Sequence, residues 1–173
     1  MTQYPFSQLD VFTAVPLRGN PLAVVHEAAA LSEAQMAAFA NWTNLSETTF
    51  LLPPGEGADY AVRIFTPARE LPFAGHPTLG SCQAWLNAGG TPRGETIVQH
   101  CAAGLIPIRR DGPRLAFRAP PLIRSGPADE ETRQRISAGT GIEPGALEAV
   151  EWIDNGPGWC GALLRDVDTL RAV

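Results

Sequence analysis

The sequence contains no lysine, because all thirteen of its basic residues are arginine. Without a lysine these 173 residues cannot form the Schiff base that pyridoxal phosphate enzymes use. The lysine of a phosphate-binding P-loop is missing for the same reason. Cysteine is scarce too, with three widely spaced residues and no C-x-x-C pair. We therefore expect no disulfide framework and no metal site, and we predict reduced cysteines in a cytoplasmic protein.

Long apolar runs and extended basic clusters are also absent from the sequence. No apolar stretch reaches the roughly 18 residues that a membrane-spanning helix needs. The first residues, MTQYPFSQLDVF, do not have the pattern of a signal peptide. The net charge is -5, and only Arg109 and Arg110 form a basic pair, whereas a nucleic-acid-binding domain normally has a basic face. We therefore expect neither a membrane nor a nucleic acid as a partner.

The patterns that are present indicate an α+β protein. Alternation of apolar and polar residues predicts strands, at 7–16, 22–27, 48–53, 59–67 and 95–100, with a hairpin over 104–120. Two helices are predicted between them, at 32–42 and 77–87. Ser32 and Gln35 have the spacing of a capping box at the start of the first helix. Many strands with two helices in this order are typical of the α+β class.

The chain changes character after residue 120. The segment 120–127, PPLIRSGP, has the composition of a linker. A polar helix at 128–141, two strands and the start of another helix are predicted to follow it. Two strands and two helices bury little apolar surface. We therefore predict a first domain over 1–120 and an incomplete second one over 121–173.

A histidine marks the predicted start of the second helix, in the stretch LPFAGHPTLG. Because Pro77 suits the first position of a helix, Gly75 and His76 would lie at the helix N-terminus. Free backbone N–H groups and the positive end of the helix dipole can bind a carboxylate or a developing oxyanion there. The same dipole would keep His76 neutral near pH 7. A histidine that only caps its helix fits this pattern as well.

A single acid, Glu47, lies in the polar run NLSETTF, where an apolar strand begins. Burial against that strand would raise the pKa of Glu47 from its usual value of about 4.3 towards neutrality. Such a carboxylate would be an efficient general base. A surface acid at the start of a strand is the alternative interpretation. Asn20, in RGNP, is interpreted as a turn former.

Four stretches resemble the phenazine biosynthesis PhzF-like isomerase family: DVFTAVPLRGNPLAVV, NLSETTFLL, RIFTPARELPFAGHPTLG and DNGPGW. The resemblance implies a diaminopimelate-epimerase-like fold, in which two similar domains each wrap an antiparallel sheet around a central helix. The active site would lie in the cleft between the domains, and no metal or organic cofactor would be used. The family's type reaction isomerises trans-2,3-dihydro-3-hydroxyanthranilate, a small cyclic carboxylic acid.

The resemblance also implies roles for individual residues. Glu47 matches the acid of the family's SE pair, which is its catalytic base and acid. His76 matches the histidine of GHP, which positions the substrate. Further contacts with the substrate are expected from Ser46, Gly75, Pro77 and Thr78. The two catalytic candidates are thus the same two residues that the local patterns single out, and this agreement favours a functional role for both.

Two departures from related sequences limit the expected chemistry. Related racemases carry a thiol where this sequence has Ala74, so thiol-based racemisation is not expected. The D-x-x-T-G-S block of the family's second half is missing. We therefore expect a natural short protein, half of a split gene product or a truncated chain, with little activity alone. It would pair as a homo-oligomer or with a complementary second-half chain. A non-catalytic remnant that binds a partner chain or a small ligand is the alternative.

Overall fold

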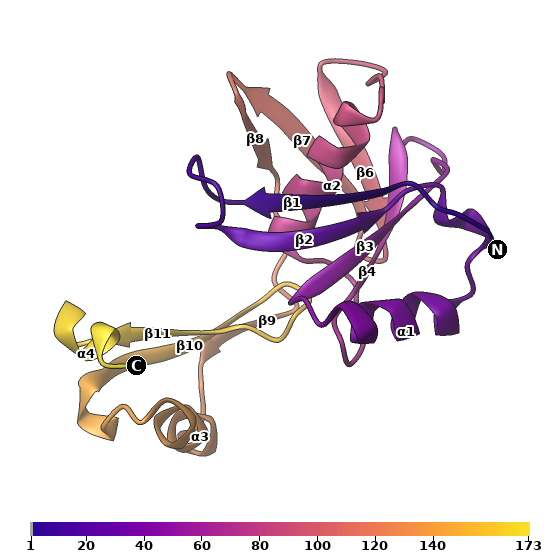
Figure 1. Ribbon diagram of the computed structural model, residues 1–173. Helices are drawn as coiled ribbons and strands as arrows, with labels where there is room; N and C mark the ends of the chain where they lie inside the picture. Colours follow the sequence, from indigo (N-terminus) through magenta and orange to yellow (C-terminus); the bar gives the residue numbers. More distant parts are fainter. Residues whose placement is uncertain (1) are drawn as a thin grey trace. The chain divides into compact units, whose positions relative to one another are not determined.

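A computed structural model describes residues 2–173, which form two compact units that divide between Pro120 and Pro121 (Figure 1). The first unit is built on an eight-stranded sheet. Its strands are β1 (Phe6–Val11), β2 (Asn20–Val25), β3 (Glu47–Leu52), β4 (Tyr60–Phe65), β5 (Glu70–Leu71), β6 (Thr96–Cys101), β7 (Gly104–Asp111) and β8 (Arg114–Phe117). Its helices are α1 (Glu33–Thr43) and α2 (Gly75–Asn87), with a short 3-10 turn at Ala28–Ala30.

The sheet of the first unit is mixed, so the prediction of an antiparallel sheet is wrong in part. β2 pairs with β3 in parallel, and so does β4 with β6, whereas the other pairs are antiparallel. The reason lies in the connections, because parallel neighbours need a crossover of a dozen or more residues that usually contains a helix. α1 lies in the crossover from β2 to β3, and α2 lies in the crossover from β4 to β6.

The sheet curls around α2, which gives the first unit its core. The main strand order is β1-β2-β3-β4-β6-β7-β8, and α2 contacts β1 and β8, the two ends of that order, as well as β2, β3 and β4 (Figure 1). A helix can touch both ends of one sheet only if the sheet bends around it. The prediction of a sheet wrapped around a central helix is thereby confirmed, apart from the strand directions.

The outer face of the sheet is covered by α1. Met36 and Ala40 of this helix are buried together with Phe50 and Phe65 of β3 and β4. The side chain of Ser32 accepts a hydrogen bond from the backbone N–H of Gln35, and Gln35 Oε1 accepts one from the backbone N–H of Ser32, so the predicted capping box is confirmed. Both faces of the central strands of the first unit are thus covered by a helix.

The second unit is a smaller α+β element with a three-stranded sheet in the order β11-β10-β9. Its elements are β9 (Arg124–Pro127), α3 (Glu130–Thr140), a 3-10 turn (Pro144–Ala146), β10 (Leu147–Asp154), β11 (Cys160–Leu164) and α4 (Val167–Arg171). The interpretation of 120–127 as a linker is wrong in part, because β9 lies within it. β9 is held by antiparallel pairing with β10, which no local pattern in RSGP indicates.

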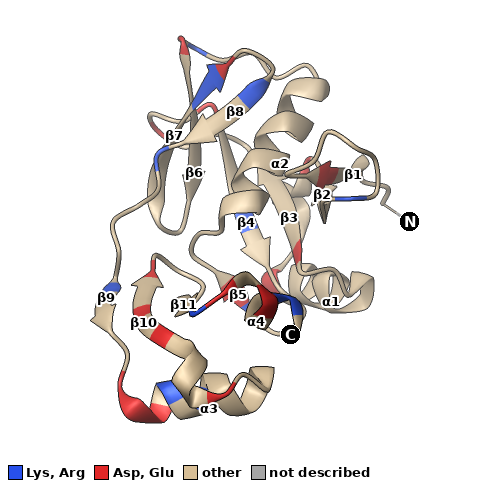
Figure 2. Ribbon diagram, turned by 90° about the vertical axis from the view of Figure 1, so that its left-hand side faces the viewer, with Lys and Arg blue, Asp and Glu red and all other residues tan. Residues whose placement is uncertain are grey.

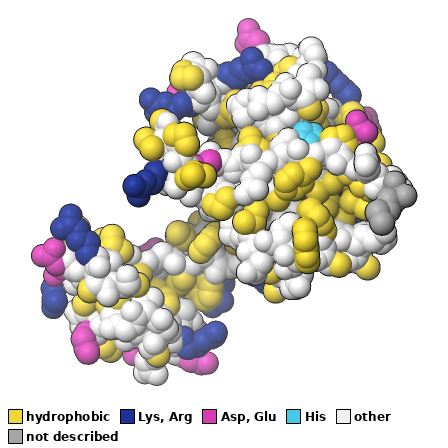
Figure 3. Space-filling model, in the orientation of Figure 1, with side chains coloured by type: hydrophobic (Ala, Val, Ile, Leu, Met, Phe, Trp, Pro, Cys, Tyr) yellow, Lys and Arg dark blue, Asp and Glu magenta, His cyan; other side chains and the backbone are white. Residues whose placement is uncertain are grey.

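Charged and apolar side chains are unevenly distributed on the surface. Figure 2 shows basic residues on the hairpin of β7 and β8, which carries Arg109, Arg110 and Arg114 beside Asp111. Figure 3 shows hydrophobic side chains exposed on the visible face of both units. Within residues 2–173, no helix is both long enough and apolar enough to cross a membrane.

Candidate active site

The start of β3 lies beside the start of β2, and this brings two polar residues together. Glu47 is the first residue of β3, and in the parallel pairing it is opposite Leu22 of β2. Parallel strands begin at the same edge of a sheet, so Asn20, the first residue of β2, lies at the same edge as Ser46 and Glu47. The predicted start of a strand in NLSETTF is confirmed.

The N-terminus of α2 lies at the same place in the fold. The helix begins at Gly75, with Ala74 as its N-cap, two residues before the predicted start at Pro77. Proline is tolerated at this third position because the first backbone N–H groups of a helix have no partner within the helix. Thr78 is the first residue whose N–H bonds back, to the carbonyl of Ala74. Gly75 and His76 therefore present the backbone N–H groups of the first turn, at the positive end of the dipole.

Glu47 and His76 form a close pair at this edge. The distance from Glu47 Oε2 to His76 Nδ1 is 3.5 Å, and the two side chains are only 13% and 7% exposed. At this separation a single small substrate can contact both side chains. Glu47 Oε2 and His76 Nε2 are buried side-chain atoms without a hydrogen-bond partner among the described residues. Such atoms are uncommon in folded proteins and point to a missing partner such as a ligand.

Asn20 links this pair to its surroundings. Its Nδ2 lies 3.3 Å from His76 Nδ1, and its Oδ1 accepts a hydrogen bond of 3.0 Å from Ser46 Oγ. The interpretation of Asn20 as a turn former is therefore wrong, because it begins a strand and its side chain faces the candidate site. Its role depends on the parallel register of β2 and β3, which the sequence alone does not reveal. The only local signal was its place in a stretch that resembles the family.

Burial determines the charge of the histidine. It lowers the pKa of His76 below the usual 6.5, although the neighbouring Glu47 carboxylate acts in the opposite direction. His76 is therefore neutral near pH 7, as the sequence led us to expect, but burial is the largest cause. A neutral imidazole has one nitrogen that donates and one that accepts a hydrogen bond. The pair thus combines a carboxylate with an imidazole that can act as a donor.

The remaining predicted site residues lie nearby with different environments. Ser46 is exposed, and its hydroxyl is bonded to Asn20. Pro77 is buried, and Thr78 is completely buried, with its hydroxyl donating to Ala74 and accepting from Gln99. These contacts place Thr78 in the core network, and its predicted contact with a substrate stays a prediction.

Packing explains why a glycine stands at position 75. A Cβ atom at this position would lie 3.2 Å from Cζ of Phe117, at the end of β8. The absence of a side chain therefore allows the last residue of β8 to approach the start of α2. The substrate contact predicted for Gly75 stays a prediction.

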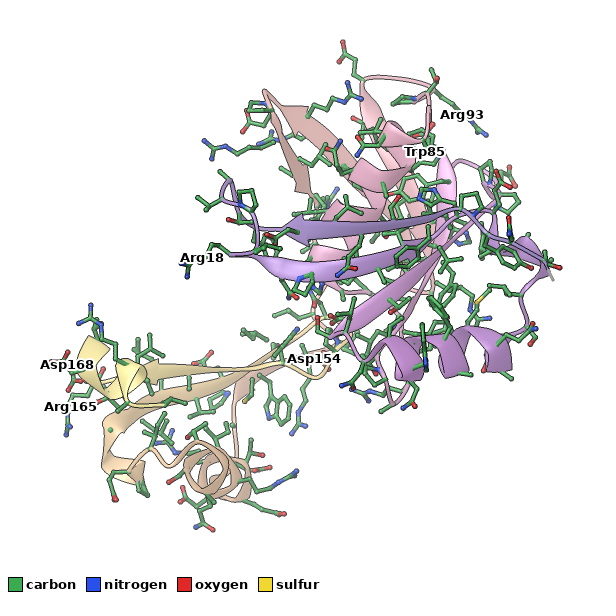
Figure 4. The ribbon with its side chains drawn as sticks, in the orientation of Figure 1. Arg18, Trp85, Arg93, Asp154, Arg165 and Asp168 are labelled. Carbon is green, nitrogen blue, oxygen red and sulfur yellow. The ribbon has the colours of Figure 1, made fainter. Side chains whose placement is uncertain are left out.

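An aromatic residue borders the pair on the side of the β1–β2 connection. The ring of Phe12 lies 6.3 Å from that of His76, centroid to centroid. Phe12 is 70% exposed and has a positive φ of 67°, and Leu17 in the same connection has a φ of 63°. Bulky residues rarely adopt this conformation, which is found more often at functional sites than elsewhere. Arg18, labelled in Figure 4, follows Leu17, and its backbone N–H donates to Asp10.

Other reactive residues of the first unit lie away from this edge. Cys82 is buried within α2, and burial raises its pKa to about 11, which makes it a poor nucleophile. Trp85, labelled in Figure 4, stacks on Tyr60 at the opposite end of α2. His26 is bonded to Ser7. Over residues 2–173, no three or more histidine, cysteine, aspartate or glutamate side chains are grouped so that they could hold a metal ion.

The turn DNGPG in the second unit has a structural explanation. Asp154, at the end of β10 and labelled in Figure 4, accepts hydrogen bonds from the backbone N–H groups of Gly156 and Gly158. These bonds are 2.8 and 2.7 Å long. The carboxylate thus stabilises the turn that carries it, as an aspartate often does in such a position.

Comparison with known proteins gives consistent matches. The model of a family described as phenazine biosynthesis-like protein matches residues 9–150. "Antisense-enhancing sequence 1" of Schizosaccharomyces pombe is 41% identical over 92% of this chain and 57% of its own length. The "trans-2,3-dihydro-3-hydroxyanthranilate isomerase" of Pseudomonas aeruginosa is 40% identical over 95% of this chain and 59% of its own length. The chain thus spans somewhat more than half the length of these relatives.

Solved structures show the same fold. A PhzF-family phenazine biosynthesis protein from Bacillus anthracis superposes with a TM-score of 0.76 at 23% identity, over 99% of this chain and 59% of its own. A PhzF-family protein from Enterococcus faecalis superposes with a TM-score of 0.69 at 28% identity, over 96% and 59%. These two superpositions cover nearly the whole of this chain and somewhat more than half of each solved structure.

Proposed function

The chain belongs to the phenazine biosynthesis-like protein family, and from that premise we propose that it carries one half of the active site of a cofactor-free isomerase. The reaction would be a proton shift on a small cyclic carboxylic acid. The substrate class follows from the Pseudomonas aeruginosa relative, which is named an isomerase of trans-2,3-dihydro-3-hydroxyanthranilate. The residues of this chain that would act are Glu47 and His76.

One observation carries the proposal most directly. Glu47 Oε2 and His76 Nε2 are both buried and both without a hydrogen-bond partner among the described residues. Leaving a buried polar atom unpaired costs about 1–3 kcal/mol. The two side chains approach each other to 3.5 Å, measured from Glu47 Oε2 to His76 Nδ1. Two unpaired buried atoms on such close side chains are difficult to explain by folding alone. A bound substrate that offers a proton to one and an acceptor to the other would satisfy both.

The proposed roles follow from the chemistry of the groups. Glu47 would remove a proton from one carbon of the substrate and return it to another carbon on the same face. His76 and the N–H groups of Gly75 and His76 at the start of α2 would bind the substrate carboxylate or stabilise developing negative charge. Because His76 is neutral, it would hold the substrate through a hydrogen bond and not through a salt bridge.

The proposal includes a partner for the second unit. Trp159, Leu163, Val167 and Leu170 are each about 60% exposed. Apolar side chains gathered on a small unit are typical of a surface that another chain covers. Since the matched relatives are longer than this chain, we propose that a complete cleft forms in a homo-oligomer or with a complementary second-half chain, and that the chain alone is nearly inactive.

A second candidate function is binding without catalysis. The chain covers only 57% and 59% of its two named relatives, so a stable unit that binds a partner chain or a small ligand is a real alternative. The same pair of residues would then hold a ligand that is not converted. The two candidates differ in whether a carbon-bound hydrogen of the ligand exchanges with solvent.

The test uses trans-2,3-dihydro-3-hydroxyanthranilate in deuterated water, with product and label followed by mass spectrometry. The chain is assayed alone and after co-expression with the part of the Pseudomonas aeruginosa isomerase that this chain does not match. We expect turnover with deuterium incorporation in the complemented sample, and little or none for the chain alone. Binding of the substrate in both samples without any exchange would support the non-catalytic alternative. Full turnover by a monomeric chain would show that the partner proposal is wrong.

A further inference from the structure

Phe12 follows directly after β1, and packing does not explain its side chain. Val11, the last residue of β1, is buried, whereas 70% of Phe12 is exposed. A phenylalanine side chain that leaves water makes one of the larger contributions to the stability of a fold. Phe12 makes little of that contribution within the described part of the chain. Its ring is therefore available to something that does not belong to the core of the first unit.

The connection from β1 to β2 holds Phe12 in a backbone conformation that costs energy. Its φ of 67° lies in the left-handed region, which bulky residues rarely adopt. The carboxylate of Asp10 accepts a hydrogen bond of 3.2 Å from the backbone N–H of Arg18, which closes the connection. A Cβ atom at Gly19 would overlap the backbone carbonyl of Val11, so the chain returns in close contact with the end of β1. Such strain persists where the surrounding structure fixes it, and it is common at ligand-binding sites.

This conformation brings the ring of Phe12 to the pair formed by Glu47 and His76. The ring centroids of Phe12 and His76 are 6.3 Å apart, and the ring planes are inclined by 55°. Aromatic rings attract each other at such separations. His76 Nδ1 in turn lies 3.5 Å from Glu47 Oε2. An exposed aromatic ring thus borders the two side chains whose buried atoms, Glu47 Oε2 and His76 Nε2, lack a hydrogen-bond partner among the residues described.

Two other apolar side chains of the same connection are exposed, Val15 at 60% and Leu17 at 93%. A partner chain that covers the connection would explain all three exposed side chains. Phe12 differs from the other two because it has an aromatic ring and because that ring lies against His76. The face of an aromatic ring packs most favourably on another flat, unsaturated ring. The position of Phe12 therefore favours a small cyclic ligand over a partner chain.

We propose that Phe12 is a substrate-binding residue that selects ligands with a flat, unsaturated ring. The ring of a cyclic carboxylic acid packs against Phe12, while Glu47 and His76 contact the polar groups of the acid and the hydrogen that is moved. This inference rests on the proposed function, which supplies the class of ligand and its site. Phe12 transfers no proton, so it contributes to binding and not to the chemical step.

The test is an NMR titration of the whole 173-residue chain with 3-hydroxyanthranilate, a stable aromatic analogue of the proposed substrate. Protons above the face of an aromatic ring shift upfield, so we expect the ring protons of the bound ligand to shift upfield. Phe12→Ala should abolish this shift and weaken binding about tenfold. Phe12→Tyr keeps the ring and should retain both. In the complemented protein, Phe12→Ala should raise KM by about the same factor with little change in kcat.

Two further variants separate ligand binding from structural damage. Leu17→Ala removes an apolar side chain from the same connection, at a similar φ of 63°, and should leave the affinity and the ligand shift unchanged. Phe12→Gly relieves the strain of the positive φ. It should unfold at the temperature of the parent chain or above it, while the upfield shift of the ligand is lost. A lower unfolding temperature would show that Phe12 serves stability, and the inference would be overturned.

The outcomes distinguish this inference from the proposed function. No binding by the parent chain, or the same affinity and upfield shift in Phe12→Ala, would overturn the role of Phe12 even if the complemented chain is an active isomerase. Loss of complementation in Phe12→Ala without loss of ligand binding would also overturn it, in favour of a partner-chain contact. Ring-dependent binding by a chain that exchanges no carbon-bound hydrogen after complementation would support the role of Phe12 and contradict the proposed isomerase.

Discussion

The two units of the chain differ in how their apolar and polar groups are buried. In the first unit, sixteen buried residues form one cluster inside the curled sheet, and a second cluster lies beneath α1. In the second unit, four buried residues form the only described cluster, and α3 has no buried residue. The first unit also holds polar atoms that are buried and unpaired at one edge, Glu47 Oε2 and His76 Nε2. The second unit also has one such atom, Trp152 Nε1 in β10, so the two units differ in core size and in the close pairing of Glu47 with His76.

The side chains of the two units are suited to different tasks. The first unit positions chemically active side chains on rigid elements, at the starts of two strands and a helix. The second unit offers exposed apolar residues and turns stabilised by its own carboxylates. We therefore expect substitutions in the first unit to affect proton transfer and folding strongly. Matched substitutions in the second unit should have smaller effects on both proton transfer and folding.

Glu47→Gln should have the largest effect. The amide keeps the shape of the side chain but cannot accept a proton from carbon, so exchange in the complemented protein should fall by about 10²–10⁴-fold. Binding of the substrate should change little. The matched control is Glu151→Gln in β10, an exposed acid of the second unit, which should retain the parent rate. Exchange at the parent rate in Glu47→Gln would mean that the base lies elsewhere.

A matched pair of leucine truncations tests the difference in core size. Leu22 is fully buried in the large cluster, and Leu147 is 3% exposed in the small one. Truncation of a buried leucine to alanine costs about 2–5 kcal/mol, depending on how well the site can collapse. We expect Leu22→Ala near the upper end and Leu147→Ala near the lower end. Hydrogen exchange resolved by peptide gives the free energy of opening for each unit, and equal losses would contradict the comparison.

Two helical glycines provide a smaller contrast. A Cβ atom at Gly80 in α2 would overlap Cδ2 of Leu22 and lie 3.0 Å from Cγ2 of Val11. Gly80→Ala should therefore destabilise the first unit by about 1–3 kcal/mol. At Gly139 in α3 a Cβ atom would meet nothing within 4 Å, so Gly139→Ala should stabilise the second unit by about 0.4–1 kcal/mol. Thermal unfolding monitored by circular dichroism measures both, and changes of the same sign would refute the contrast.

Acidification should have the smallest effect and should be confined to the first unit. Burial lowers the pKa of His26 and of His76 below 6.5, so below that pH the unfolded chain binds more protons than the folded one. The stability of the first unit should therefore fall as the pH falls through 6.5. The second unit has no histidine.

The carboxylates of the second unit titrate at lower pH. Hydrogen bonds lower the pKa of Asp129 at the start of α3, and those from Thr169 lower the pKa of Asp166 at the start of α4 to about 2. Their contribution is lost only as the pH falls below the usual value of an aspartate, near 3.8. Hydrogen exchange at pH 7 and pH 5, corrected for intrinsic rates, should show loss of protection in the first unit only. An equal loss in the second unit would be evidence against this assignment.

The candidate residues could be predicted from the sequence, but their supporting contacts could not. Glu47 and His76 lie in two specific stretches, and the resemblance placed both at one site. The contacts of Asn20 depend on the parallel register of β2 and β3, which is set by the crossover through α1 and not by local pattern. The same reason explains why β9 was taken as linker, since only its pairing with β10 makes it a strand.

The start of α2 shows a different limit of the sequence. Pro77 was a good indicator of a helix start, but proline is acceptable anywhere in the first turn. The helix begins two residues earlier, at Gly75. The residue types thus predicted the start of the helix to within one helical turn. They could not show that Phe117 packs against Gly75.

The central claim, that the first unit carries a site for a cyclic carboxylate, can be tested on the chain by itself. The measurement is an NMR titration with 3-hydroxyanthranilate, a stable aromatic analogue of the proposed substrate, followed through backbone amides and the imidazole signals of His76. We predict shift changes centred on the N–H groups of Gly75 and His76 and on the side chain of Asn20, and their loss in His76→Ala. Shift changes confined to the second unit, or equally large in His76→Ala, would contradict the account.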